Sequence, residues 1–287
     1  MTAKISLTVL LAVKNEALNL PRCLGSLGAA ERVVVLDSGS TDDGPAIAAK
    51  YGAEVVQFRY EGGYPKKRQW ALETLQIKTG WVLLLDADEF IPAELWAEID
   101  MAIRNPSAAD AFFVTKGFHF LGRRMRFGGF SHSAILLFKT GTARFERIFD
   151  DTASGLDMEV HERVIVEGSV GKLKTPLIHE DFKGLEAYID RHNKYSSWEA
   201  RLRFGYLRSG RYGADTIERR FFGNSQERRR FLKALVVRVP LEGLVWFVYH
   251  YFLRLGILEG RPGLIAAQIR ASYISQVRAK VFELRLK

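Results

Sequence analysis

The sequence has 287 residues, of which 47% are hydrophobic and 26% are charged, a composition that is typical of globular proteins and excludes a disordered chain. Cys23 is the single cysteine, which excludes an internal disulfide and a zinc site built from several cysteines. The net charge of +9 is uneven: residues 1–181 contain 21 Lys and Arg against 24 Asp and Glu, whereas residues 182–287 contain 21 against 9. The excess positive charge therefore lies in the last third.

The first 110 residues alternate between the patterns of strands and helices. Apolar runs predict strands at 5–13, 32–36, 53–58 and 81–85. Helices are expected at 16–28, through 47–51 with Thr41 or Asp42 as a cap, at 66–77 and from Pro92 to about Arg104. The run at 5–13 is followed by polar residues instead of a cleavage site, which favours a strand over a signal peptide. This alternation predicts an α/β fold, with a mainly parallel sheet and helices on both faces.

After Asp110 the pattern changes. Shorter strands are expected at 111–115, 134–139 and 163–166, and the chain is predicted to be helical from Leu185 onward. Charge places a boundary near residue 182. We therefore expect a catalytic domain at 1–181, with halves at 1–110 and 111–181, and a helical, basic C-terminal extension at 182–287.

Three carboxylates follow the apolar run that ends at Leu85. Asp86, Asp88 and Glu89 emerge where open α/β sheets bind their ligands. Like charges placed there repel one another unless a cation lies between them, although a solvated turn is the alternative. Oxygen ligands favour Mg²⁺ or Mn²⁺, which usually hold a substrate phosphate as well. The motif predicts metal-dependent handling of a phosphorylated compound.

Three further groups of residues are candidates for binding or catalysis. Asp37 follows the second strand and suits a base and ribose, or a helix cap. The segment 62–69 runs from glycines into a basic helix start, which suits a phosphate or a uracil carbonyl, or is simply solvated. Glu162 is a candidate general base and His179 a candidate metal ligand, although a lone histidine is more often structural. Phosphate-loop, dinucleotide-binding and nucleophile-elbow motifs are missing.

Taken together, these residues resemble the family 2 glycosyltransferases of the GT-A fold, and in particular the WaaE-like lipopolysaccharide core glycosyltransferases. The resemblance runs along nearly the whole chain. Its ordered segments are 13–16, 35–42, 64–72, 85–89, 122–130, 160–162, His179 and 254–263.

The resemblance implies an inverting transfer of a sugar from a nucleotide-diphosphate sugar, with UDP expected as the nucleotide, to a glycan or glycolipid acceptor. Its expected nucleotide contacts are Asn15, Glu16, Asp37, Lys66, Arg68 and Asp86. Its expected ligands of Mg²⁺ or Mn²⁺ are Asp86, Asp88 and His179, and Glu162 is the expected catalytic base. Leu136 stands where the family often has an arginine.

The basic C-terminal extension suggests an anionic membrane surface as a partner. The apolar segment 241–258 contains Glu242, His250 and Arg254, which argues against a membrane-spanning helix. Its aromatic residues, together with Arg219, Arg220 and Arg228–Arg230 nearby, suit a lipid interface. We expect a cytoplasmic protein that is peripheral on the inner membrane, although these helices would also be explained by packing on the catalytic domain.

Two other functions remain alternatives at this point. Haloacid dehalogenase-type phosphohydrolases also have Asp-x-Asp after an apolar strand, but normally near the N-terminus and followed by Thr or Val, where this chain has Glu89-Phe90. A non-catalytic nucleic-acid-binding protein would use the basic extension, but no nucleic-acid-binding module accompanies the charge. The acidic strand ends would then have no role, so no nucleic-acid partner is expected.

Overall fold

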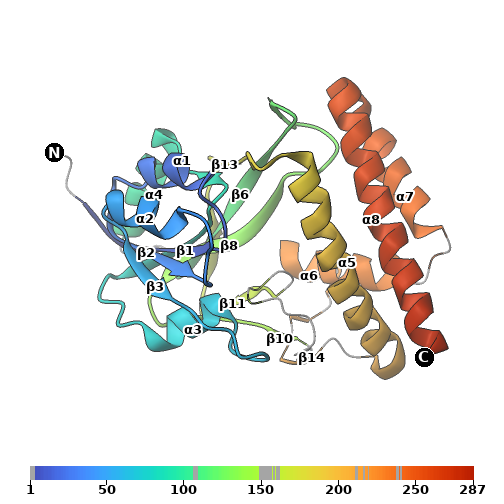
Figure 1. Ribbon diagram of the computed structural model, residues 1–287, viewed down its shortest axis with the longest axis horizontal. Helices are drawn as coiled ribbons and strands as arrows, with labels where there is room; N and C mark the ends of the chain where they lie inside the picture. Colours follow the sequence, from blue (N-terminus) through green and yellow to red (C-terminus); the bar gives the residue numbers. More distant parts are fainter. Residues whose placement is uncertain are drawn as a thin grey trace. The chain divides into compact units, whose positions relative to one another are not determined.

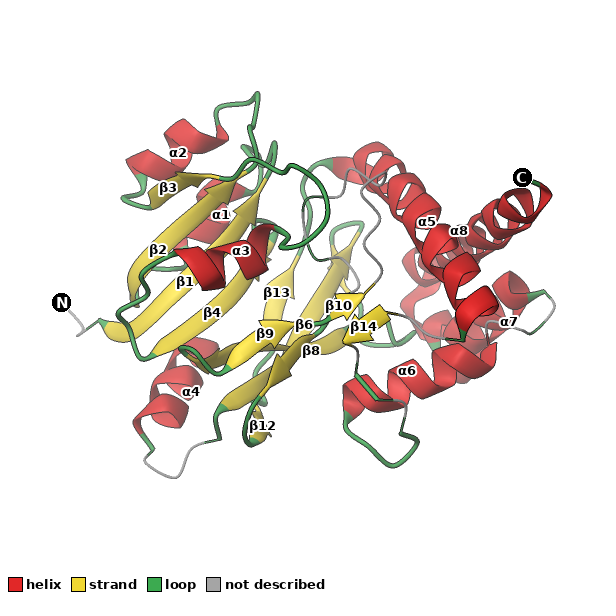
Figure 2. Ribbon diagram, turned by 90° about the horizontal axis from the view of Figure 1, so that it is seen from below, coloured by secondary structure: helices red, strands yellow, loops and turns green. Residues whose placement is uncertain are grey.

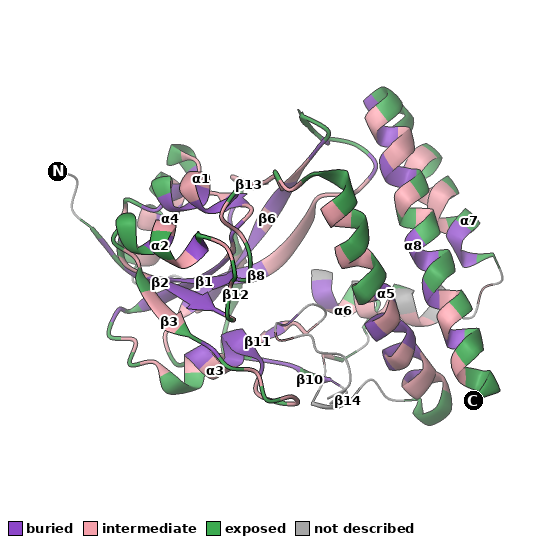
Figure 3. Cartoon of the chain, viewed as in Figure 1, coloured by how far each residue is buried: buried purple, intermediate pink, exposed green. Residues whose placement is uncertain are grey.

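The first half of the chain forms four parallel strands. In the computed structural model, β1 (Ile5–Val13) lies between β2 (Ala30–Asp37) and β4 (Trp81–Asp86), and β3 (Glu54–Gln57) pairs with the far side of β2. The apolar residues of β1 and β4 are buried because helices cover both faces of a parallel sheet. Figure 3 shows β1 coloured as buried. The register places Asp37 beside Val13 and Asp86 beside Ala12. Both aspartates therefore reach the same edge of the sheet.

The structure describes residues 4–105, 109–148, 157, 159, 162–210, 213–215, 217–218, 220–236, 239 and 241–287. Within these residues the main sheet has ten strands, in the order β3-β2-β1-β4-β8-β6-β13-β5, with β7 and β12 paired to β6 (Figure 2). The added strands are β5 (Glu89–Phe90), β6 (Ala111–Phe120), β7 (Arg123–Arg124), β8 (His132–Lys139), β12 (Val170–Lys172) and β13 (Leu177–His179). β8 is antiparallel to β4, and β13 to β5. The parallel arrangement is thus confined mainly to the first half.

Helices cover both faces of the sheet, as predicted. Figure 1 shows α1 (Leu20–Gly25), α2 (Gly44–Lys50) and α4 (Ala93–Arg104) on one face and α3 (Lys67–Thr74) on the other. The indole Nε1 of Trp96 in α4 donates to the Ser26 carbonyl at the end of α1, at 2.7 Å. This bond ties two helices of the same face together.

The predicted helix at 16–28 is shorter in the structure. α1 begins only at Leu20, because the preceding residues bond to the loop after β2. Asn15 has a φ of 55°, and the Ala17 amide donates to the Asp42 carboxylate at 2.8 Å. The same carboxylate accepts from the amide of Gly44, the first residue of α2, at 3.0 Å, although Asp43 holds the cap position.

The chain divides into two compact units. The first comprises residues 1–117, 133–145 and 155–182, and the second 118–132, 146–154 and 183–287. In the first unit β9 (Ala143–Phe145) pairs with β11 (Val164–Val166). The second contains α5 (Gly184–Ser209), α6 (Ser225–Val236), α7 (Glu242–Val248), the π-helix η2 (Tyr249–Leu253), the 3₁₀ helix η3 (Gly256–Glu259) and α8 (Gly260–Leu286). The predicted helical region is interrupted by β14 (Gly213–Asp215), which pairs with β10 (Arg147–Ile148).

A buried ionic network joins three helices of the second unit. The Arg203 guanidinium of α5 donates to Glu199 of the same helix and to Glu242 of α7, at 2.8–3.0 Å. Tyr273 of α8 donates its hydroxyl to Glu199 at 2.6 Å. Because each buried charge has an opposite partner, the network fixes how these helices pack on one another.

His192 of α5 makes the stability of the second unit sensitive to acid. Its ring stacks on Tyr188, with centroids 3.9 Å apart, and its Nδ1–H donates to the Tyr188 carbonyl at 2.8 Å. Burial lowers the pKa of this imidazole from 6.5 to about 4. Between these two values the unfolded chain binds the proton more tightly than the folded one, so stability is complete above the upper value and is lost as the pH falls toward the lower.

We therefore expect the free energy of unfolding to fall by about 2–3 kcal/mol between pH 6.5 and pH 4 through this residue alone. The His192→Gln variant should lose this part of the slope. Urea unfolding at several pH values measures the difference between the two proteins. If the free energy of unfolding fell equally with pH in the variant and in the parent, His192 would not be the cause of the acid sensitivity.

Candidate active site

The loops after β1 and β2 are bonded to each other. The Asn15 amide donates to Ser40 Oγ at 2.9 Å, and the Asn15 side-chain oxygen accepts from the Thr41 amide at 2.8 Å. Ser40 in turn donates from its amide and its hydroxyl to the buried carboxylate of Asp37. Asn15 and Asp37, both predicted nucleotide contacts, are thus brought to one place at the edge of the sheet.

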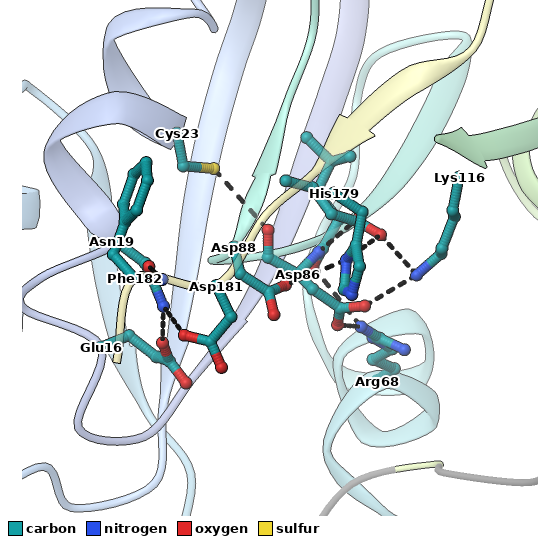
Figure 4. Close-up of polar contacts among 12 residues, drawn as sticks. Glu16, Asn19, Cys23, Arg68, Asp86, Asp88, Lys116, His179, Asp181 and Phe182 are labelled. Carbon is teal, nitrogen blue, oxygen red and sulfur yellow. Dashed lines mark hydrogen bonds and ion pairs between the residues drawn. The ribbon is translucent and has the colours of Figure 1, made fainter. Parts of the chain in front are cut away.

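Asp86 lies between two buried cations. One carboxylate oxygen accepts from Arg68 of α3, and the other accepts from Lys116 Nζ of β6 at 2.7 Å (Figure 4). Burial alone would raise the pKa of Asp86, but Arg68 and then Lys116 outweigh it and hold that pKa far below its ordinary value. Asp86 is therefore an anion at any physiological pH.

Glu89 and His179 are brought to this cluster by strand pairing. β5 and β13 are antiparallel, and the register places His179 directly beside Glu89. The carboxylate of Glu89 contacts Lys116 Nζ at 2.6 Å and accepts from the Asp86 amide at 2.9 Å. Asp88 lies on the other side, with its Oδ1 at 3.4 Å from His179 Nδ1. One charged cluster thus contains Arg68, Asp86, Asp88, Glu89, Lys116 and His179, and all of these except Glu89 are labelled in Figure 4.

The imidazole of His179 carries a positive charge in this cluster. Burial would lower its pKa, but Asp88 and then Glu89 outweigh burial and raise it to about 9. A proton on the ring therefore supplies the cation that the adjacent carboxylates require.

The start of α3 is bonded to the segment that contains Glu162. Lys66 Nζ contacts Glu162 Oε1 at 2.6 Å, and the Lys67 amide donates to the Asp157 carbonyl at 2.9 Å. The buried carboxylate of Glu159 accepts from the amides of Arg68 and Gln69, at 3.2 and 3.0 Å. The sequence suggested that backbone amides at this helix start could bind a phosphate. In the structure the amides of Arg68 and Gln69 instead bind a carboxylate of the protein itself.

Glu16 lies in a second polar group beside the cluster. Its carboxylate accepts from the Asn19 side-chain amide at 2.8 Å, and the same amide nitrogen donates to Asp181 at 2.9 Å. The Asn19 side-chain oxygen accepts from the Phe182 amide at 2.9 Å. Figure 4 shows this group next to Asp88. It attaches the residues that follow β13 to the start of α1, and so supports the position of His179.

Asp88 and His179 are the residues best placed to hold a divalent ion. No group of three or more His, Cys, Asp or Glu suited to a metal occurs among the residues that the structure describes. A Mg²⁺-type site nevertheless needs only one or two protein ligands, because substrate phosphates and water complete its shell. The imidazolium of His179 between Asp88 and Glu89 marks a position that favours a cation, and a divalent ion bound there would replace the proton on the ring, because a histidine ligand must be neutral. Both oxygens of Asp86 are engaged by Arg68 and Lys116, so direct coordination by Asp86 would have to displace one of them.

Sequence reasoning missed two residues of the site. Lys116 and Glu159 are both buried, and each reaches the cluster or α3 from a segment distant in sequence. The signal for Lys116 was a lysine within the apolar run Ala111–Phe120, since a charge in a buried strand needs an opposite partner. His161 lies outside the described residues. Leu136 is a core residue of β8.

Comparisons with known proteins agree on one class. Residues 8–152 match the family model described as Glycosyl transferase family 2. The chain is 28% identical to the lipopolysaccharide core biosynthesis glycosyltransferase LpsC of Rhizobium meliloti, over 99% of this chain and 94% of that protein. An uncharacterized glycosyltransferase of Rickettsia bellii is 26% identical, over 100% of this chain and 89% of that protein.

A solved structure, the mannosyltransferase PcManGT of Pyrobaculum calidifontis in complex with GDP-Man and Mn²⁺, aligns with 98% of this chain and 88% of that one. Its TM-score is 0.48 and its sequence identity 14%.

The Lys116→Met variant tests the charge cluster. It leaves Glu89 without its nearest cation and Asp86 with Arg68 alone, so we expect a loss of about 3–5 kcal/mol in the free energy of unfolding. Lys139→Met is the matched control, since Lys139 contacts Asp110 at the surface and should cost less than about 1 kcal/mol. Urea denaturation measures both. Equal losses would show that Lys116 is not a required counter-charge.

Proposed function

Because the chain belongs to glycosyl transferase family 2, it is a glycosyltransferase that uses a nucleotide sugar, and we propose that it transfers the sugar with inversion to a lipopolysaccharide or other lipid-linked acceptor. Family membership decides against the phosphohydrolase and the nucleic-acid-binding alternatives. The observation that carries the proposal is the position of Asp88 beside His179, directly after the central strand β4, whose last residue Asp86 pairs with Arg68 and Lys116.

We propose that the donor binds across the carboxyl ends of β1, β2 and β4. Asn15, Glu16 and Asp37 would contact the nucleoside. The family's pattern predicts that this nucleoside is the uridine of UDP. Asp88 and His179 would hold Mg²⁺ or Mn²⁺, with Asp86 beside them as a further predicted ligand. When bound, the ion offsets the negative charge that develops on the departing diphosphate. Arg68, held by Asp86, adds a fixed positive charge at the same edge.

We propose Glu162 as the general base. Its carboxylate is almost buried and is held by Lys66 at 2.6 Å, so the protein fixes the carboxylate's position before substrate arrives. Glu162 would accept the proton of the acceptor hydroxyl as that oxygen attacks the anomeric carbon. The bond to the nucleotide diphosphate breaks at the same time, which gives inversion without a covalent enzyme intermediate.

The acceptor class is proposed from the relatives. The similarity to LpsC extends over nearly the full length of both chains, which supports an acceptor related to the lipopolysaccharide core. Such acceptors are anchored in lipid. We therefore propose that the enzyme is cytoplasmic and acts as a peripheral protein on the inner face of the inner membrane.

The Asp88→Asn variant tests the metal site. It removes a charged ligand but keeps the shape of the side chain, so Mn²⁺-dependent release of nucleoside diphosphate from a nucleotide sugar should fall by at least about a hundredfold. A thermal-shift screen of nucleotide sugars with Mn²⁺ selects the donor for this assay. Asp190→Asn, at an exposed position of α5, should behave like the parent. Unchanged turnover by Asp88→Asn, or full turnover in EDTA, would refute the proposed site.

The Glu162→Gln variant tests the base. The amide keeps the bond to Lys66 but accepts no proton, so kcat for transfer should fall by about 10²–10⁴ while the affinity for the donor is retained. The measurements are transfer kinetics and isothermal titration with donor and Mn²⁺. Glu167→Gln, at an exposed position, serves as control. A variant with parental kcat would show that another residue takes the proton.

A further inference from the structure

An exposed apolar stripe runs along α7 and η2 of the second unit. It consists of Leu241, Leu244, Val245, Val248 and Phe252, all of them exposed, and Leu241 is 72% exposed. At α-helical spacing the three positions within α7, Leu244, Val245 and Val248, fall within an arc of about 100°. A surface helix normally buries such an arc, whereas here it faces outward.

The opposite side of the same helices makes the contacts with the rest of the unit. Glu242 bonds to Arg203, and His250 contacts the Gly128 carbonyl at 2.5 Å. Gly243 packs so closely on α8 that an added Cβ would lie 2.8 Å from the Ala271 carbonyl oxygen. The orientation of the stripe is therefore fixed by specific packing.

The turn that follows continues the apolar surface. Leu253, Leu255, Ile257 and Leu258 are all exposed, and Leu253 is 72% exposed. Leu241, at the start of this surface, and Leu255, within the turn, have φ values of 54° and 59°. A leucine in the left-handed region is strained, and a glycine at the same position would not be. The fold therefore holds both leucines in this conformation despite an unfavourable backbone energy.

Charge in this segment is segregated. The only acidic residues within 241–261 are Glu242 and Glu259, which are 1% and 2% exposed. Glu259 accepts from the amides of Arg126 and Phe127 and pairs with Arg123. Arg254 and Arg261, in contrast, are exposed. The outer surface of the segment is therefore apolar and cationic, without an exposed carboxylate.

The arginines that the sequence suggested for lipid contact, Arg219, Arg220 and Arg228–Arg230, are only partly available for it. Arg230 is turned to the buried carboxylate of Glu146 at 2.7 Å, so it is not available to lipid. Arg219 lies outside the described residues, as does the side chain of Arg229.

We propose that residues 241–261 form a docking surface for an anionic lipid bilayer, with the apolar stripe and Leu253 inserted at the level of the headgroups. In the described part of the chain no helix is long and apolar enough to cross a membrane, so the segment lies on the bilayer. Arg254 and Arg261 complement the anionic headgroups. Two copies of this chain that met through the same surface would instead bring like charges together. The inference deepens the proposed function and rests on it only for the lipid-linked nature of the acceptor.

Vesicle flotation with the full-length protein tests the proposal. The parent should bind vesicles containing about a third phosphatidylglycerol and bind pure phosphatidylcholine vesicles weakly, with binding reduced by salt. The Leu244→Ser, Phe252→Ser, Leu253→Ser triple variant should bind at least about tenfold less. Arg261→Gln should weaken binding to the anionic vesicles alone.

The matched control carries Leu18→Ser, Met101→Ser and Phe282→Ser, which remove equally exposed apolar side chains elsewhere, and it should bind like the parent. Hydrolysis of a soluble nucleotide sugar with Mn²⁺ should be unchanged in the triple variant, which separates this proposal from the proposed catalytic function. Equal vesicle binding by the parent and a correctly folded triple variant would overturn the proposal. So would a parental dimer, seen by light scattering, that the triple variant abolishes without any vesicle binding by the parent.

Discussion

The site depends on the burial of several charges at the end of one strand. Asp86 and Glu89 are three residues apart and share the ammonium group of Lys116. Arg68 and the protonated His179 complete the balance. If one of these cations were removed, the buried carboxylates would be left with too little opposite charge in a region that water reaches poorly, which costs several kcal/mol. The positions of β6, α3 and β13 are therefore constrained by electrostatics as well as by apolar packing.

This constraint explains why the sheet changes direction where it does. A purely parallel sheet would bring further strand ends to the edge where Asp37 and Asp86 lie. Instead β13 returns antiparallel to β5 and sets His179 beside Glu89. Lys116 reaches the same place from the middle of β6. The mixed half of the sheet thus supplies Lys116, His179 and Glu89 to the cluster, whereas Asp86 comes from the parallel half.

The parts of the site that are local in sequence could be predicted from it. The apolar run before Asp86 and the alternation of strands and helices follow from period and length alone, and they placed both aspartates at one edge. Lys116 and Glu159 could not be assigned in this way, because their partners are 30 and about 90 residues away and depend on strand order. The shortening of α1 likewise results from a bond to Asp42, a tertiary effect that overrides helical propensity.

The bonds between α3 and the segment that contains Glu162 have a mechanical consequence. Lys66 holds Glu162, and the next two residues, Lys67 and Arg68, are bonded to Asp157 and Glu159. Three consecutive residues at the start of α3 are therefore attached to the segment that contains Glu162. Arg68 at the same end of α3 also contacts Asp86. A shift of the helix by incoming diphosphate would be transmitted to Glu162, the proposed general base. On the proposed roles, binding of the donor and deprotonation of the acceptor would thus be coupled through α3.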